Sequence, residues 1–350
     1  MNNNLASREI SDFLSKHFPQ LNQLSSAEFY DWKIFNSPFG RGQIILEIAG
    51  GEVAATASLT VKPLIINDQE TIGAEIGDTF THPAHRRKGL FSKMVRGCLD
   101  YAKENGMAPI YGTPNRQSLP GYETKLGFPR CESASVKDMF KEIDRKFLIA
   151  KIAGKVRNRL LATILGNVYW LVIATRNKIG SFNATRIDWH EISSFPPGLN
   201  SRWATSRKDY SFFVGRDTDY LNWRFHSNPN SYRMFLGMIN GIARCYFVSK
   251  LIKQGDHHIG YLCDYVCWND DMKMFSAMLG MAEKSLAKDG AMGVELYCGR
   301  NSPYFKIARR LGYRLIGDIV VIAAQSSAHG KTLIESKQKW HFTMADADGV

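Results

Sequence analysis

Residues 75–91 read EIGDTFTHPAHRRKGLF, and this stretch says more about the architecture than any other part of the chain. Its first part has the pattern of a strand that ends at Pro83, and its second part is a basic loop, RRKG at 86–89, which opens a helical pattern. A strand, a loop and a helix in this order direct several backbone N–H groups and the positive end of the helix toward one point. This arrangement predicts a site for a diphosphate, to which the three basic side chains add positive charge.

Length and composition indicate a globular chain of two domains. The chain has 350 residues, of which 44% are hydrophobic and 22% charged, and this is long for a single core. The net charge of +12 favours polyanionic partners without choosing among them. The six cysteines show no spacing typical of metal ligands, so we expect reduced thiols and no metal. The N-terminal sequence MNNNLASREISDF lacks the apolar core of a secretory signal, which predicts a cytoplasmic protein.

The sequence contains a repeat of long period. Trp32 and Trp223 each precede a proline at the same spacing. Two turn dipeptides, two helical patterns that open near Phe91 and Phe275, two apolar strands and two Leu-Gly-aromatic endings then follow in the same order. This similarity indicates a tandem duplication. We predict an α/β layered (α+β) fold of two tandem domains, each with a mixed, mostly antiparallel sheet flanked by helices.

The predicted organisation is an N-terminal domain at 1–138, a basic helical insert at 139–204 and a C-terminal domain at 205–350, whose last residues, 345–350, we expect to be frayed. The insert includes the run 146–178, whose apolar centre is shorter than the roughly 20 residues that span a bilayer. Two interpretations remain open: a helical linker packed between the domains, or a basic amphipathic helix in peripheral contact with the inner face of the membrane.

The same features resemble the GNAT superfamily of acyl-CoA-dependent N-acyltransferases. The signature of that family is a hydrophobic strand followed by [Gln/Arg]-x-x-Gly-x-[Gly/Ala] at the start of the central helix. Arg86 and Gly89 fit this pattern, whereas Phe91 departs from it because Gly or Ala is usual there. Downstream, an apolar strand, Asn115 and the run from Tyr122 to Leu-Gly-Phe resemble the ending of the family. The resemblance covers the first copy well and, through the repeat, most of the chain loosely.

The resemblance implies a site for acetyl-CoA or another acyl-CoA as co-substrate. In the family, the strand before the loop and the strand after the helix diverge, and pantetheine lies between them. A backbone N–H near the end of the first strand would polarise the thioester carbonyl. The implied coenzyme contacts in this chain are Phe80, Thr81, His82, Arg86, Arg87, Lys88, Gly89, Leu90, Phe91 and Asn115.

Tyr122 matches the tyrosine that often protonates the departing thiolate in this family, although a packing role is the alternative. The attacking amine must lose a proton, because a primary ammonium has a pKa of roughly 10. Glu75 and Asp78 lie on the predicted strand and are the candidate bases. Strand alternation places them on opposite faces unless a bulge intervenes. We prefer Asp78, and keep His82 and His85 as further candidates.

The second copy replaces the basic glycine loop with Trp-Asn-Asp-Asp at 268–271. Acidic residues suit a helix N-terminus as caps but would repel a diphosphate. We therefore expect a degenerate C-terminal copy that binds no coenzyme and forms a wall of the acceptor groove. The candidate acceptor contacts, each of which is also a candidate for the core or the domain interface, are Trp32, Trp223, Arg224, Tyr304 and Trp340.

The leading hypothesis is an N-acetyltransferase, or an N-acyltransferase for a longer chain, that acts on a primary amine. Candidate acceptors are an amino sugar of a cell-surface polysaccharide or a sugar nucleotide. A second hypothesis takes the acyl group from an acyl carrier protein, whose acidic surface would bind a basic face. A third notes a similarity to aminoacyl-tRNA-dependent peptidoglycan transferases, which lack the basic glycine loop. The fourth is a non-catalytic nucleic-acid- or membrane-binding protein, but the sequence has no motif for single strands or helix-turn-helix, so no nucleic acid is expected.

Overall fold

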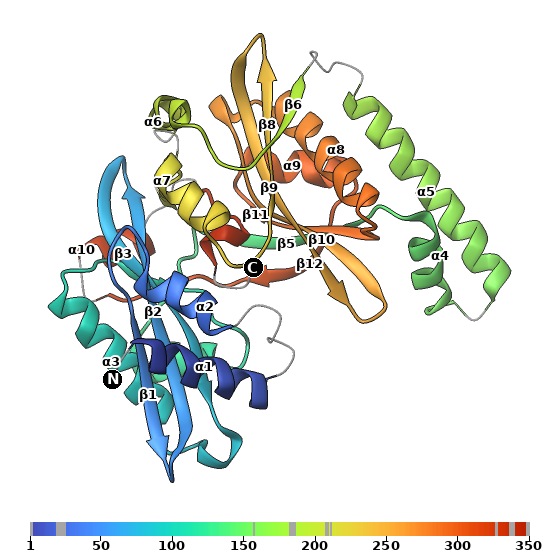
Figure 1. Cartoon of the computed structure of the whole chain (residues 1–350). Helices are drawn as coiled ribbons and strands as arrows, with labels where there is room; N and C mark the ends of the chain where they lie inside the picture. The colour runs from blue at the N-terminus through green and yellow to red at the C-terminus, as the bar shows by residue number, and fades with distance from the viewer. Residues whose placement is uncertain are drawn as a thin grey trace.

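Two mixed β-sheets flanked by helices form the structure (Figure 1). The structure is a computed structural model and describes residues 3–18, 26–156, 158–181, 187–206, 210, 212–325, 328–335 and 340–347. Most neighbouring strands in both sheets are antiparallel, and each sheet contains a parallel pair. This confirms the predicted class of two tandem layered domains.

Sheet A is built mainly from the first copy. Its strands follow the order β1 (Gln43–Ala49), β2 (Glu52–Ile66), β3 (Gln69–Thr81), β4 (Ile110–Gly112) and β13 (Ile322–Ala323), with β7 (Phe212–Val214) paired to β2. The helices and short helical turns of this copy are α1 (Asn3–His17), α2 (Ala27–Tyr30), η2 (Asp31–Phe35), η3 (Pro83–His85), α3 (Leu90–Glu104) and η4 (Gly121–Lys125). Helix α3 packs on sheet A through an apolar face that includes Met94, Val95 and Cys98.

Sheet B is built mainly from the second copy. Its strands follow the order β12 (Arg314–Ile319), β5 (Val136–Glu142), β11 (Gly293–Gly299), β10 (His257–Cys267), β9 (Ile242–Gln254), β8 (Arg233–Ile239) and β6 (Asp188–Ile192). The helices and turns of this half are η5 (Pro197–Leu199), α6 (Asn200–Ser206), α7 (Thr218–Leu221), η7 (Asn222–His226), η8 (Trp268–Asp270), α8 (Met272–Lys288), α9 (Pro303–Arg310), α10 (Ala328–Glu335) and η9 (Met344–Asp346). The apolar face of α8 packs on this sheet as that of α3 packs on sheet A.

The two copies exchange strands. β5 follows the first copy in sequence but lies in sheet B, antiparallel to both β11 and β12. In return, β13 from the C-terminal half pairs with β4 in sheet A, where Ile322 lies opposite Gly112. The predicted domain boundaries, after residue 138 and before residue 205, therefore do not separate the two sheets, because each sheet includes a strand from the other half of the chain. Separating the two halves would break hydrogen-bonded ladders in both sheets.

The internal duplication is visible where the two copies meet. Trp32 of η2 and Trp223 of η7 stack with ring centroids 4.9 Å apart and an angle of 23° between the rings. The indole Nε1 of Trp32 donates a hydrogen bond of 3.0 Å to the carbonyl of Trp223. Both residues are buried, so these repeated tryptophans hold the two domains together.

The helical insert does not lie between the domains. It forms a hairpin of α4 (Arg145–Ala153) and α5 (Arg159–Ser181), whose principal contacts are with each other and with α8. Figure 1 shows α5 on the outer side of the second domain, away from the first. The interpretation as a packed inter-domain linker is therefore wrong.

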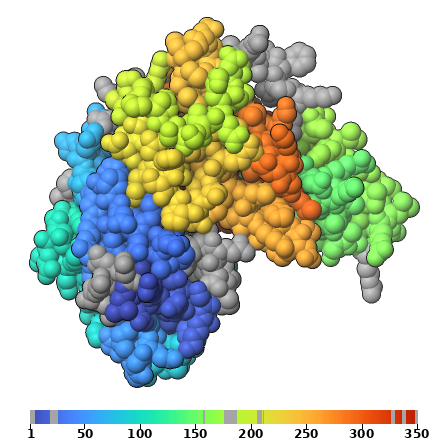
Figure 2. Space-filling model, viewed as in Figure 1, coloured from blue at the N-terminus to red at the C-terminus, as the bar shows by residue number. Residues whose placement is uncertain are grey.

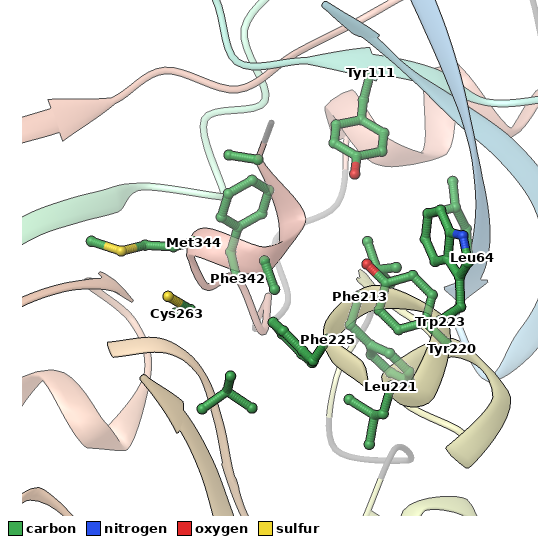
Figure 3. Packing of buried hydrophobic residues seen from close by; sticks show 14 of the residues in the cluster. Leu64, Tyr111, Phe213, Tyr220, Leu221, Trp223, Phe225, Cys263, Phe342 and Met344 are labelled. Atoms are coloured by element: carbon green, nitrogen blue, oxygen red, sulfur yellow. The ribbon is translucent and has the colours of Figure 1, made fainter. Parts of the chain in front are cut away.

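The C-terminal segment, residues 340–347, is buried inside the molecule. Trp340 forms a parallel bridge with Phe212 of β7, so the segment pairs with a strand of sheet A. Figure 3 shows Phe342 and Met344 of this segment in the core that also contains Cys263 and Tyr111, from different copies. The expectation of a frayed end is wrong for 345–347, because these residues fill the space between the domains; residues 348–350 lie outside the described part of the chain.

Candidate active site

A cavity of about 550 Å³ opens where β3 and β4 diverge. The two strands pair in parallel at Ala74 with Ile110 and at Glu75 with Tyr111, and the described ladder continues no further. Beyond these pairs, β3 and the segment 112–122 form opposite walls of the cavity. This is the divergence that the GNAT resemblance implies for pantetheine.

A bulge in β3 places both candidate bases at the wall of this cavity. The ladder between β2 and β3 shifts register opposite Thr56 and Ser58, and Asp78 has a positive φ of 49°. The hydroxyl of Thr56 donates a hydrogen bond of 2.6 Å to the backbone carbonyl of Asp78, which stabilises the bulge. Regular alternation would have separated Glu75 and Asp78, but the bulge leaves both on the cavity wall.

Asp78 has three polar partners and retains access to the cavity. Its carboxylate accepts hydrogen bonds from Lys33 Nζ at 2.7 Å, Ser58 Oγ at 2.6 Å and Tyr30 Oη at 3.2 Å. The side chain is 15% exposed, whereas that of Lys33 is 3% exposed. Asp78 is therefore fixed in orientation and still able to meet an incoming amine.

Glu75 is placed differently. Its side chain is 1% exposed and pairs with Lys62 Nζ at 3.1 Å. A buried carboxylate is tolerated only when it is paired, so this ion pair explains how Glu75 can lie in the middle of sheet A. Asp78 is the better placed of the two candidate bases.

Tyr122 lies in η4 with its hydroxyl 3.2 Å from Thr79 Oγ1, next to Asp78 on β3. Burial raises the pKa of Tyr122 above its usual range, so the phenol keeps its proton at neutral pH. The ring packs edge-on against Phe91 at 5.0 Å. Phe91 also fills the space beside Gly121, where a Cβ would approach its ring to 2.7 Å. Phe91, where the family pattern has Gly or Ala, is therefore accommodated by packing against Gly121 and Tyr122.

The basic loop leaves the N-terminus of α3 available to an anion. Gly89 is the N-cap residue with φ of 78°, and no side chain among the described residues caps this end of the helix. Arg87 also has a positive φ, of 63°. The loop side chains are largely exposed. Free N–H groups at a helix start, flanked by Arg86 and Lys88, form an anion-binding arrangement.

The equivalent helix in the second copy is capped by its own side chain. Asp271 is the N-cap of α8 and accepts hydrogen bonds from the N–H groups of Lys273 at 2.9 Å and Met274 at 3.0 Å. The capping role expected for the acidic run is therefore confirmed at Asp271. Two of the donors that would face a phosphate are already used.

Side chains pack together at the corresponding place between β10 and β11 of the second copy. Tyr265 Oη donates to the carbonyl of Tyr297 at 2.8 Å, across β10 and β11. Tyr304 Oη donates to the carbonyl of Cys267 at 2.9 Å. The C-terminal segment packs against the same place, where His341 contacts the rings of Tyr265 and Tyr304. Aromatic side chains and the chain's own C-terminal segment thus fill this region.

The five predicted acceptor residues lie outside the cavity at Asp78. Tyr304 and Trp340 are in packed interiors, each 2% exposed, and Arg224 is 4% exposed with its Nε 3.4 Å from the carbonyl of Ala345. Trp32 and Trp223 line a separate, open groove at the domain interface. Large aromatic side chains are buried more often than they bind ligands, and this preference decides their positions here.

The second half of the chain nevertheless contributes to the cavity. The lining residues from this half are Tyr297, Asp318, Ile319, Val320 and Ala347. Sequence reasoning missed them because the strand exchange and the buried C-terminal segment bring them to the first copy. No local motif marks these positions. Of the predicted coenzyme contacts, Phe80 and Asn115 line the cavity, and the rest lie at the end of β3, in the loop to α3 and in the first turn of α3.

A pair of carboxyl groups lies next to Tyr297. Glu295 and Asp138 share a hydrogen bond between β11 and β5, and burial raises the pKa of Glu295 to about 8 and that of Asp138 to about 6. Two buried carboxyl groups that share a hydrogen bond are most stable when they hold one proton between them.

We expect the free energy of unfolding to reflect this proton. Between pH 4.5, the usual pKa of a glutamate, and pH 8, the folded protein keeps a proton that the unfolded chain has released. The free energy of unfolding should therefore fall as pH rises through this window. In Glu295→Gln this decrease between pH 4.5 and pH 8 should be smaller by about 1–3 kcal/mol. Urea unfolding at pH 4.5 and pH 8 measures the difference. Glu104→Gln, at an exposed position of α3, is the control, and an equal pH response in both variants would contradict the prediction.

Comparisons with known proteins bear on the family and the fold of the chain. Residues 6–130 match the family model described as an acetyltransferase (GNAT) domain. Among solved structures, the chain is similar to a GCN5-related N-acetyltransferase from Anabaena variabilis, with a TM-score of 0.60 and 10% identity over 92% of this chain and 70% of that one. A search of curated proteins finds no significant match.

Two further solved structures have related architectures. N-myristoyltransferase of Saccharomyces cerevisiae with bound myristoyl-CoA and inhibitors gives a TM-score of 0.62 at 11% identity, covering 90% of this chain and 76% of that one. A tandem GNAT protein from the clavulanic acid biosynthesis pathway gives 0.53 at 12% identity, covering 83% and 84%. At these identities the likeness demonstrates a common fold and leaves the substrates open.

Proposed function

We propose that the protein is an N-acyltransferase that moves an acetyl or longer acyl group from acyl-CoA to a primary amine. The premise is that residues 6–130 match the acetyltransferase (GNAT) domain model and that the chain shares its fold with a tandem GNAT protein. The observation that carries the proposal is the cavity between β3 and β4, which has Asp78 and the neutral phenol of Tyr122 on its wall. The reaction needs a proton acceptor for the amine and a proton donor for the leaving thiolate, and these two side chains meet both needs.

The proposed reaction runs as direct transfer. Asp78 takes a proton from the acceptor ammonium, and the free amine attacks the thioester carbonyl. A backbone N–H of β3 stabilises the oxyanion, and the carbon–sulfur bond then breaks as Tyr122 protonates the thiolate. The amide nitrogen loses its second proton, which restores the phenol of Tyr122, and Asp78 releases its proton to solvent, so that the products are an amide, free CoA and one proton. Phe80, Thr81 and His82 are proposed to pair with pantetheine, and residues 86–91 to hold the diphosphate.

The second copy is proposed to have lost coenzyme binding and to serve as a wall for the acceptor. The capped start of α8 and the aromatic filling of its strand divergence support this division of roles. Asp318, which pairs with Lys137, and Tyr297 extend the cavity on that side. We propose action in the cytoplasm, with an amino sugar as the first acceptor class to test.

The acyl donor could be an acyl carrier protein instead of acyl-CoA, and this is the main competing hypothesis. An acyl carrier protein would present the same thioester arm without the adenine nucleotide, so it would depend less on the diphosphate loop. A non-catalytic binding protein would bind acyl-CoA weakly and show a steep salt dependence with nucleic acid. Both alternatives are separated from acyl-CoA-dependent transfer by direct binding measurements.

Gly89→Glu should abolish acyl-CoA binding, because it places a carboxylate at the diphosphate position and strains a residue with φ of 78°. Calorimetric titration with acetyl-CoA and a long-chain acyl-CoA measures this and reports the preferred chain length. Gly241→Glu is the matched control, since Gly241 has φ of 74° and equally open space in the second copy. Equal binding by wild type and Gly89→Glu, or no binding by wild type, would contradict the proposed coenzyme site.

A further inference from the structure

Helix α5 carries an exposed apolar face that the proposed chemistry does not use. Of the fourteen large hydrophobic side chains exposed in the described structure, eight belong to this helix. They are Leu160, Leu161, Ile164, Leu165, Val168, Tyr169, Leu171 and Val172. The run 160–175 contains no charged residue. An apolar patch of this continuity on a basic protein marks an interaction surface.

The rest of α5 fixes this face toward the outside. Ala162 and Ile173 are buried on the opposite side of the helix. Gly166 lies so close to α4 that a Cβ there would approach Ile149 to 2.6 Å. Arg145 at the start of α4 donates to the side-chain oxygen of Asn167 at 2.9 Å and 2.7 Å. Because its inner face is already packed, α5 cannot bury the outer face by rotating. Figure 2 shows the hairpin projecting at one edge of the molecule.

The charge of the hairpin identifies its partner. Residues 145–186 contain nine Lys and Arg and no Asp or Glu, so they account for nine of the twelve net positive charges of the chain. Lys151 is partly neutralised by Glu142 at 3.1 Å. A second copy of the chain would bring the same positive segment against itself, and the like charges would oppose association. An anionic surface with an apolar interior complements both the charge and the apolar face.

We propose that the α4–α5 hairpin holds the protein on the surface of an anionic membrane, with the apolar face of α5 at the boundary between headgroups and acyl chains. Among the described residues no helix is both long and apolar enough to cross a bilayer. α5 therefore lies along the surface, where Lys146, Lys155 and Arg159, exposed basic residues of the hairpin, meet the lipid phosphates. This inference is independent of the proposed acyl transfer.

Vesicle co-sedimentation of the full chain tests the proposal. Wild type should bind vesicles of phosphatidylglycerol and phosphatidylcholine, bind pure phosphatidylcholine vesicles much more weakly, and lose binding at high salt. The double variant Ile164→Gln with Val168→Gln, whose native side chains are 51% and 55% exposed, should bind about ten-fold more weakly. Glutamine leaves the net charge unchanged, so this loss reports the apolar contact alone.

The matched control is Ile242→Gln with Leu315→Gln, at exposed apolar positions outside α5. It should bind vesicles as wild type does. Circular dichroism and acyl-CoA titration verify that both variants are folded. The proposal is overturned if wild type does not bind anionic vesicles, if the two double variants bind equally, or if light scattering shows a wild-type dimer that the α5 variant dissolves. That last outcome would assign the face to a second copy.

Discussion

Tyr122→Phe should lower kcat about 100-fold or more while changing the affinity for acyl-CoA by less than about three-fold. The hydroxyl is the only group removed, and the ring keeps its contacts with Phe91 and Phe128. Because burial raises the pKa of Tyr122, the phenol remains protonated at neutral pH and is available to the departing thiolate. Loss of an acid that acts only in the transition state lowers turnover and leaves ground-state binding nearly unchanged.

The second copy provides the matched control for this experiment. Tyr304→Phe removes an equally buried hydroxyl, which donates to the carbonyl of Cys267. We expect this variant to turn over like wild type and to lose only some stability. Steady-state kinetics with a primary amine and calorimetric titration with acyl-CoA give the two readouts. A Tyr122→Phe enzyme that loses affinity in proportion to turnover would show a packing role instead of an acid.

Much of the first copy follows from local sequence. The loop RRKG predicts where α3 starts. Its glycine suits the left-handed backbone conformation that Gly89 adopts as the N-cap of the helix. Tyr122 is predicted from its place before Leu-Gly-Phe, and the structure places it on the cavity wall beside Thr79. The position of Asp78 at the cavity is harder to predict. It depends on a bulge that Thr56 of another strand stabilises, and the sequence of β3 itself does not indicate the bulge.

The rest of the site depends on contacts that sequence patterns do not encode. β5 has the alternation of any strand, and nothing in it distinguishes pairing with its own copy from pairing with β11 and β12. β13 is two residues long, too short to carry a period. The predicted acceptor contacts were aromatic and basic residues such as Trp340 and Arg224. In the structure these side chains are buried and fill the space between the domains.

A buried charge network explains how the second copy holds the C-terminal segment. Arg216 is fully buried and lies 3.1 Å from Asp264 of β10 and 2.6 Å from Asp346 of η9. Thr343 donates to Asp264 at 2.7 Å, and Tyr246 donates to its other oxygen at 2.8 Å. Asp264 directly follows a register shift in β10, and Asp78 lies within a register shift in β3. The carboxylate that faces the cavity in one copy is thus matched by one that anchors the chain in the other.

Arg216→Met should therefore destabilise the protein by about 3–5 kcal/mol, because it leaves two carboxylates buried without a counter-charge. Burial alone would raise the pKa of Asp264, but Arg216 outweighs this and lowers it, so the network stabilises the native state above the usual aspartate pKa and less as pH falls. The loss in the variant should accordingly shrink at acidic pH. Urea unfolding followed by tryptophan fluorescence measures it. Arg233→Met, which breaks partly exposed pairs with Glu191 and Asp289, should cost less than about 1 kcal/mol. Adding Asp264→Asn to Arg216→Met should restore part of the stability, and a further loss instead would show that the carboxylate is held by groups other than Arg216.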